Sequence, residues 1–482
     1  MFDLRPVGYV TGLLVAILGL AMLLPAGLDF YDGHENWTAL LESAILTLLC
    51  GVLLAVACAN GMGPRLTIRQ TFLVTTGVWL ALPVFGALPF LIGATEARPV
   101  DAFFEAMSGL TTTGATVFTG LDALPRGLLL WRAILQWLGG IGIIVVAMVF
   151  LPELKVGGMQ IFKSESFDTF GKILPRAAEI ASSIVWIYLA LTLAGVLGYI
   201  AAGMQPFDAV AHALTSIATG GMSTRDASFG EFKGAAEYVA TLMMLVASLP
   251  FVLYVQALAA RLSPLFGNAQ VRTYLQVIVV AVLALTVYRV WTQEQSFEPV
   301  FRETLFNVTS IISGTGYAST DYQTWGAFAV MSFFLLGLIG GCAGSTSCSV
   351  KIFRYQILFA AIRAQIRQIH SPRGVFTPRY EGRPVGDDVI SSVMSFFVLF
   401  LVTMGVLAVA LSMTGLDMIT AVSGAAAALA NIGPGLGETI GPAGTYAPLN
   451  DTAKWLLCAG MFIGRLELLA VYAILTVNFW RA

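Results

Sequence analysis

The chain has 482 residues, of which 57% are hydrophobic and 11% are charged, and its formal net charge is −2. Soluble domains carry roughly 25% charged residues. This composition, with a mean hydropathy of +0.82, excludes an ordinary soluble domain and indicates a protein of the lipid bilayer.

Apolar runs long enough to cross a bilayer, about 20 residues each, recur along the chain. The first has Asp3 and Arg5 ahead of it and no convincing cleavage site, so we interpret it as a retained helix instead of a signal peptide. In chain order the runs predict ten spans, at 8–28, 39–59, 71–94, 127–151, 180–203, 236–260, 271–291, 326–345, 390–413 and 453–478.

The polar connections divide into a basic side and an acidic side. Most lysine and arginine residues lie at the termini or in 60–70, 152–178, 261–272 and 351–388, which places these segments and the N-terminus in the cytoplasm. Carboxylates on the other side predict an outer vestibule that concentrates cations, although they also serve simply to solvate loops. They include Asp101, Glu105, Asp208, Asp226, Glu231, Glu298, Glu303, Asp321 and Asp451.

Four similar small-residue segments, about a hundred residues apart, each end in a glycine, and we call them the glycine turns. They predict one unit repeated four times in a single chain. Four such turns around one axis form a ring of backbone carbonyls that replaces the water around an alkali cation. The alternative is that they are Gly-rich packing motifs between helices. The glycine turns end at Gly114, Gly221, Gly316 and Gly433.

Ahead of each glycine turn lies an apolar segment too short to cross a bilayer, which predicts a re-entrant half-helix. Asp101, Asp208 and Asp417 stand where an N-cap is expected, and Pro299 suits a first turn. The unit is therefore helix, half-helix, turn, helix, with the carbonyl end of each half-helix aimed at its turn. The four half-helices are expected at 101–111, 208–218, 298–313 and 417–430.

The residues that most often build enzyme centres are scattered. Five cysteines and three histidines show no spacing typical of a disulfide framework or a metal site. The chain has neither a G-x-S-x-G nor a G-x-x-x-x-G-K motif, so we expect no enzyme, no organic cofactor and no nucleic-acid partner.

A glycine-rich stretch and two charged residues lie inside predicted spans, where each costs free energy. A glycine-rich stretch from Gly340 to Thr346 predicts that its helix breaks in mid-membrane, since each glycine costs about 1 kcal/mol relative to alanine. A close-packed helix crossing is the alternative. Arg465 and Glu467 lie in the last apolar span, where charged groups are normally functional; Glu467 is assigned to helix packing or to another polar contact.

Six motifs in order resemble the Trk/Ktr/HKT superfamily of potassium transporters, and most closely its TrkH-type branch. The resemblance covers essentially the whole chain, and the span pair ahead of the first unit is similar to that branch. The motifs are Leu-Leu-Leu-Trp131-Arg132 with Gln136-Trp137-Leu-Gly-Gly-Ile-Gly142, Gly157-Gly158-Met159-Gln160, Ala218-Thr-Gly-Gly221-Met-Ser, Gly340-Gly-Cys-Ala-Gly-Ser-Thr346, Asn431-Ile-Gly-Pro-Gly435-Leu-Gly and Gly464-Arg465-Leu-Glu467.

The resemblance implies an all-α membrane protein whose glycine turns form a potassium selectivity filter. In plant relatives a serine at the first glycine position accompanies sodium transport, and Gly114 here favours potassium. Rubidium and some sodium are expected to pass, and a sodium-selective or weakly selective channel is the alternative. The implied filter residues are Thr112, Thr113, Gly114, Thr219, Gly220, Gly221, Gly314, Thr315, Gly316, Asn431, Ile432 and Gly433.

The family also implies a gate below the filter, made by a movable loop and by Arg465 projecting into the pore. A snorkelling or salt-bridged structural arginine is the alternative. Ser347, Cys348 and Ser349 depart from the family pattern and predict a stiffer loop. The implied gate residues are Gly340, Gly341, Gly344, Ser345, Thr346 and Arg465.

Partners and location follow from the same resemblance. The basic segment 351–388 is expected either to rest on anionic membrane lipid or to dock a separate cytosolic nucleotide-binding subunit of the TrkA type. A homodimer in the bacterial inner membrane is implied. The expected divisions are a helix pair at 1–69 and four pore units at 70–178, 179–268, 269–388 and 389–482.

Overall fold

The computed structural model describes residues 3–61, 66–146, 177–258, 267–293, 296–466 and 468–481. The described chain is almost entirely helical, with one two-residue hairpin of β1 (Arg379–Tyr380) and β2 (Arg383–Pro384). Seven of its helices are long and apolar enough to cross a membrane, or nine if each of two bent pairs is one span. The predicted all-α membrane class is confirmed. The motif at 157–160 and Glu467 lie outside the described residues.

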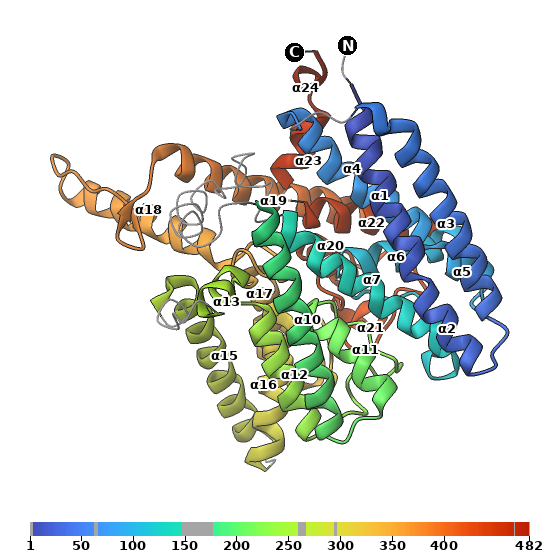
Figure 1. Cartoon of the computed structure of the whole chain (residues 1–482). Helices are drawn as coiled ribbons and strands as arrows, with labels where there is room; N and C mark the ends of the chain where they lie inside the picture. Colours follow the sequence, from blue (N-terminus) through green and yellow to red (C-terminus); the bar gives the residue numbers. More distant parts are fainter. Residues whose placement is uncertain are drawn as a thin grey trace.

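The first helices form a closely packed pair that precedes the four units (Figure 1). Gly12 and Gly51 allow the contact, because a side chain on either would overlap backbone atoms of the opposite helix. Small residues play this part in membranes, where no hydrophobic effect draws helices together. The elements are α1 (Arg5–Ala21), α2 (Leu23–Tyr31), α3 (Trp37–Cys58) and the 3-10 turn η1 (Ala59–Gly61).

The first two units follow the expected order of helix, half-helix, turn and helix. Thr67 and Gln70 form a capping box that fixes where α4 begins. Unit one contains α4 (Ile68–Gly86), α5 (Leu88–Ile92), the half-helix α6 (Pro99–Leu110), η2 (Leu121–Ala123) and α7 (Arg126–Val145). Unit two contains α10 (Ala177–Ala201), the half-helix α11 (Pro206–Ile217), α12 (Ala235–Ala247) and α13 (Phe251–Leu258).

The last two units repeat this order with additions. Unit three contains α15 (Ala269–Gln293), the half-helix α16 (Phe297–Ser313), η4 (Tyr322–Trp325), α17 (Ala327–Ile339) and α18 (Ile352–His370). Unit four contains α19 (Asp387–Met413), the half-helix α20 (Met418–Ala430), α21 (Gly437–Ile440), α22 (Asp451–Arg465), α23 (Leu468–Leu475) and α24 (Val477–Arg481).

Three of the ten predicted spans are not continuous helices. The 236–260 span bends by 89° between α12 and α13, and the 453–478 span bends by 108° between α22 and α23. The 326–345 span ends at Ile339, followed by Gly340 with φ +79°. Only this last break was predicted, and the bends in the other two were not.

Unit four packs back onto unit one. Half-helices α6 and α20 share one hydrophobic core with α7 and α22. The Lys454 ammonium lies 2.6 Å from the Asp101 carboxylate, and the Tyr446 amide donates to the Thr116 carbonyl at 2.9 Å. The chain therefore closes on itself instead of extending in a row.

Figure 1 shows the two termini together at one end of the molecule and α18 projecting from its side. The ends meet on α4, where the Gln70 side chain donates to the Asp3 carbonyl and Phe72 packs edge-on against Phe479. The base of α18 packs through Phe353 against the segment that contains the β-hairpin.

Candidate functional site: four glycine turns and the loop beneath them

Half-helices α6, α11, α16 and α20 each lead directly into a glycine turn. Proline begins α6 and α11, where its missing N–H costs nothing, and the Asp417 side chain caps α20 by accepting from the amides of Ile419 and Thr420. The carbonyl end of each half-helix carries partial negative charge. Four such ends therefore meet at the turns.

Two of the predicted caps are wrong. Arg98 and Gln205 occupy the N-cap positions of α6 and α11, and neither makes a side-chain cap. Asp101 instead pairs with Arg98 and Lys454, and Asp208 lies 3.0 Å from Arg225. Each of these carboxylates thus pairs with a basic side chain and does not cap its helix.

All four half-helices end in the same backbone motif. The residue two positions before the ending glycine of each turn is left-handed. Its φ is +52° at Thr112, +49° at Thr219, +81° at Gly314 and +51° at Asn431. The next amide donates back to the carbonyl five residues earlier at 2.9 Å in every turn, as Thr113 does to Ser108. This is the Schellman arrangement, and its fourfold occurrence shows that the four turns leave their half-helices with equivalent geometry.

The glycine that ends each turn lies against the next turn. A Cβ atom on Gly221 would overlap the Thr315 carbonyl, and one on Gly433 would lie 3.0 Å from the Gly114 oxygen. These approaches close a ring in chain order: Gly114 faces Gly220, Gly221 faces Thr315, Gly316 faces Gly433, and Gly433 faces Gly114.

All four of these glycines line one cavity. Its charged lining residues are Arg132, Arg225 and Asp226, so the cavity is not lined by carboxylates alone. Most of the outer carboxylates named above are paired: Glu105 with Arg132, Glu231 with Arg225, and Glu303 with Arg289 and Lys233. Local charge at this cavity is therefore less negative than a residue count predicts.

Side chains on other elements hold the turns in place. The Gln136 amide donates to the Gly220 carbonyl at 2.7 Å, and its oxygen accepts from the Met222 amide at 3.0 Å. Asn431 donates to the Thr113 hydroxyl at 3.0 Å and so joins the fourth turn to the first. The signal for Gln136 was present in the sequence as an amide side chain in an apolar helix.

The loop at 340–351 fits into the break between α12 and α13. The Cys342 amide donates to the Ser248 carbonyl at 3.1 Å, and the Phe251 amide donates to the Gly344 carbonyl at 2.9 Å. The Thr346 hydroxyl adds a bond to the Ala247 carbonyl at 3.0 Å. Two interrupted helices thus satisfy each other's backbone groups, which is the condition for irregular backbone at this depth.

The same loop lies directly beneath the third glycine turn. The Ser347 hydroxyl donates to the carbonyl of Ser313 at 2.5 Å and accepts from the Gly341 amide at 2.9 Å. The Ser345 hydroxyl bonds within the loop to the Cys342 carbonyl at 2.7 Å, and the Ser349 hydroxyl bonds to the Gly337 carbonyl at 2.8 Å. Ser347 and Ser349 therefore tie the loop to the third turn and to α17, whereas the Ser345 bond stays within the loop.

Arg465 ends α22 beneath the turns and is 3% exposed. Its guanidinium contacts the Cys348 sulfur and donates to the Gly139 carbonyl at 3.0 Å. Gly139 belongs to α7 of unit one, and Cys348 belongs to the loop of unit three. One arginine thus joins three units, whereas the sequence indicated neither partner.

Among the described residues no group of three or more histidine, cysteine, aspartate or glutamate side chains is arranged to hold a metal ion. The turns themselves contribute backbone carbonyls and threonine hydroxyls. Such oxygens suit a weakly bound monovalent cation as cargo.

Comparison with known proteins agrees with this geometry. A family profile described as "TrkH: Cation transport protein" matches residues 38–479. The Trk system potassium uptake protein TrkI of Halomonas elongata is 47% identical over 414 residues, covering 86% of this chain and 84% of that protein. The Trk system potassium uptake protein TrkH of Vibrio parahaemolyticus is 36% identical over 491 residues, covering 99% of each chain.

The crystal structure of the potassium transporter TrkH from Vibrio parahaemolyticus superposes with a TM-score of 0.92 at 33% identity, covering 100% of each chain. A family of membrane cation transporters also confirms the expectation that this chain is not an enzyme. The chain belongs to the TrkH family of cation transport proteins.

Proposed function

We propose that this protein takes up potassium across the bacterial inner membrane through a filter formed by the four glycine turns. The observation that carries the proposal is the closed ring of glycine approaches, from Gly114 through Gly221 and Gly316 to Gly433 and back to Gly114. The names of the relatives, which are Trk system potassium uptake proteins, support the same cargo. The four pore units run from 70 to 178, 179 to 268, 269 to 388 and 389 to 482.

In this proposal a potassium ion exchanges its water for backbone oxygens at the ring. The oxygens come from the carbonyls of the two residues before each ending glycine. Four half-helix carbonyl ends add negative potential where the ion sheds water. The carbonyls belong to Thr112, Thr113, Thr219, Gly220, Gly314, Thr315, Asn431 and Ile432.

Below the ring, the 340–351 loop and Arg465 form the gate. In the structure as it stands the loop is bonded to Ser313 of the third turn, and Arg465 bonds to that loop through Cys348. The proposed open state breaks the Arg465 contacts and moves the loop away from the path. The glycines at 340, 341 and 344 supply the backbone freedom for this motion.

Regulation and assembly complete the proposal. The N-terminus is cytoplasmic, and the protein is a homodimer with one pore in each chain. The basic segment 351–388, which includes the projecting α18, offers its exposed arginines to anionic lipid or to a cytosolic nucleotide-binding subunit. The amino terminus and α18 are then on the same side of the membrane.

The test is ion flux through the purified chain in liposomes. Rubidium uptake is expected to exceed sodium uptake, and external potassium is expected to inhibit rubidium entry at concentrations where sodium does not. Equal rubidium and sodium uptake would instead establish a weakly selective channel, and no uptake above protein-free liposomes would contradict the proposal. Imposing a proton or sodium gradient in the same assay tests whether transport is coupled.

A further inference from the structure

One position recurs on the half-helices behind the glycine turns. It lies nine residues before the glycine that ends each turn, and in the first three units a polar side chain occupies it with no exposed surface. The residues at this position are Glu105, His212, Asn307 and, in unit four, Gly424.

His212 and Asn307 make the same pair of contacts. His212 joins the Asp208 carbonyl through Nδ1 at 2.8 Å and the Ser223 hydroxyl through Nε2 at 3.0 Å. Asn307 donates to the carbonyl four residues earlier at 2.8 Å and to the Ser319 hydroxyl at 3.0 Å. Its oxygen also accepts from the Ser319 amide at 3.2 Å. In both units the side chain therefore links the half-helix to the irregular segment that follows the turn.

Glu105 makes the corresponding link in unit one, with a carboxylate in place of an imidazole or an amide. Its carboxylate accepts from the Val117 amide and from the Thr116 hydroxyl, each at 3.0 Å. Arg132 pairs with it at 2.8 Å and donates to the Ser223 carbonyl of unit two at 2.8 Å. The buried charge is thus compensated, and units one and two are joined just beyond their turns.

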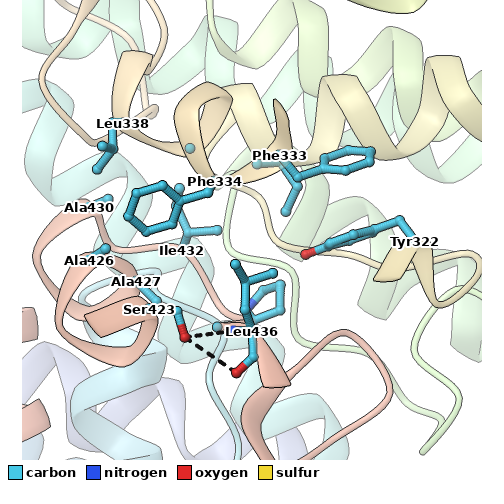
Figure 2. Close-up of a pocket in the computed structure, with 14 residues that line it drawn as sticks. Tyr322, Phe333, Phe334, Leu338, Ser423, Ala426, Ala427, Ala430, Ile432 and Leu436 are labelled. Carbon is cyan, nitrogen blue, oxygen red and sulfur yellow. Dashed lines mark hydrogen bonds between the residues drawn. The ribbon is translucent and has the colours of Figure 1, made fainter. Parts of the chain in front are cut away.

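Unit four differs. Gly424 has no side chain, and the preceding residue, Ser423, accepts from the Leu436 amide at 2.8 Å and donates to the Leu436 carbonyl at 3.3 Å (Figure 2). Figure 2 also shows an apolar pocket beside this link, lined by Phe334 of α17 and by Ala427 and Ile432 of unit four. At this position the fourth turn therefore has a lighter polar link than the other three, while Asn431 and Tyr446 support the turn from other sides.

These contacts hold each turn at its outer end. The Schellman bonds fix the end of each turn next to the half-helix. The recurrent side chain fixes the segment two or more residues after the glycine. With both ends held, the carbonyls between them cannot tilt freely. A cation site discriminates between ions only as far as its oxygens keep their spacing and number.

We propose that Glu105, His212, Asn307 and Ser423 are positioning residues that set the selectivity of the ring for potassium over sodium. They act through the backbone and do not touch the ion. This inference rests on the proposed function, since it requires that the glycine turns conduct a cation.

The test measures the ratio of rubidium to sodium uptake in liposomes for Asn307 variants. Asn307→Leu keeps the approximate volume but leaves the Ser319 amide without its acceptor, and the ratio is expected to fall about fivefold, the factor that corresponds to one net hydrogen bond. Asn307→His places the residue of unit two in unit three and is expected to recover most of the wild-type ratio. A side chain that only stabilises the fold would lower both fluxes together and leave the ratio unchanged, which would overturn the inference.

A second variant keeps the inference testable if Asn307→Leu fails to fold. Ser423→Ala deletes a single oxygen and is expected to lower the ratio of rubidium to sodium uptake, whereas Ser332→Ala on the exposed side of α17 is expected to leave it unchanged. An unchanged ratio in Ser423→Ala at normal flux would contradict the inference. If wild-type protein itself shows no preference for rubidium, the proposed function fails first, so the two failures are distinguishable.

Discussion

At the residue scale, the four glycines that end the turns do not have the same conformational need. Gly114, Gly221 and Gly316 have φ between +78° and +84°, a region that side chains rarely adopt, whereas Gly433 does not. A Cβ atom on Gly433 would still crowd Gly114, but without the added backbone strain. The requirement for glycine is therefore strictest in the first three turns.

The corresponding prediction concerns Gly→Ala substitutions. Gly221→Ala is expected to abolish selective rubidium uptake, because the methyl group overlaps the Thr315 carbonyl and the residue is left-handed. Gly433→Ala is expected to retain more uptake than Gly221→Ala. Rubidium flux in liposomes checks both.

Gly405→Ala is the matched control. Gly405 lies within α19 with no atom near its absent side chain, so alanine there is expected to leave uptake unchanged and to stabilise the helix by up to about 1 kcal/mol. Loss of uptake in Gly405→Ala equal to that in Gly221→Ala would show that the assay reports general damage.

Some residues of the site are readable from the sequence and others are not. The glycines are readable because a local pattern recurs four times. The partners of Arg465 are not, because Cys348 and Gly139 lie far away along the chain and nothing in their motifs points to an arginine. The recurrent polar position on the half-helices was readable in principle, but its chemistry changes from unit to unit and hides the repeat.

At the scale of elements, the half-helices were predictable because both of their ends carry local signals. Proline begins α6 and α11 and a capping aspartate precedes α20, whereas α16 is followed by a glycine and α20 by an asparagine with positive φ. The bend between α12 and α13 also had a signal, Pro250, which an apolar run conceals. The bend after Arg465 had no comparable signal, since no proline lies at the break between α22 and α23.

Asp417 provides a prediction at this scale. Hydrogen bonds from the side chain and backbone of Thr420 hold the pKa of Asp417 below its ordinary value of 3.8. Asp417→Ala is expected to lower the free energy of unfolding by about 1 kcal/mol at pH 7. Thermal unfolding in detergent measures the change.

The pH dependence of this effect has a definite sign. Because folding lowers the pKa of Asp417, its charged form stabilises the fold above that ordinary value, and the contribution is lost as pH falls through the lowered pKa. The difference between wild type and Asp417→Ala should therefore shrink in strong acid. Asp417→Asn keeps an acceptor and should lie near wild type at pH 7; an Asn variant as unstable as the Ala variant would argue against capping.

At the scale of the whole molecule, the proposed gate region draws on all four units. The loop of unit three fits into the bend of unit two, and Arg465 of unit four reaches Gly139 of unit one. None of these contacts is local in sequence. The sequence predicts a helix break at Gly340 and a buried Arg465. The contact between Arg465 and the loop depends on the closure of the chain around one axis.

Arg465→Ala provides the prediction at this scale. It removes the contacts to Cys348 and Gly139 and is expected to raise basal rubidium flux severalfold, because the loop loses its hold on α22. Arg481→Ala, at the exposed end of α24, is the matched control and should leave flux unchanged. Unchanged or lower flux in Arg465→Ala, with normal protein yield, would favour a purely structural arginine.

The closure of one chain into a ring also decides how such a protein evolves. In an assembly of four identical subunits, one codon change alters every quarter of the conduit at once. Here a single codon change alters one quarter and leaves three intact, so ion preference can drift in small increments. The unequal glycines of the four turns are what such independent drift would leave behind.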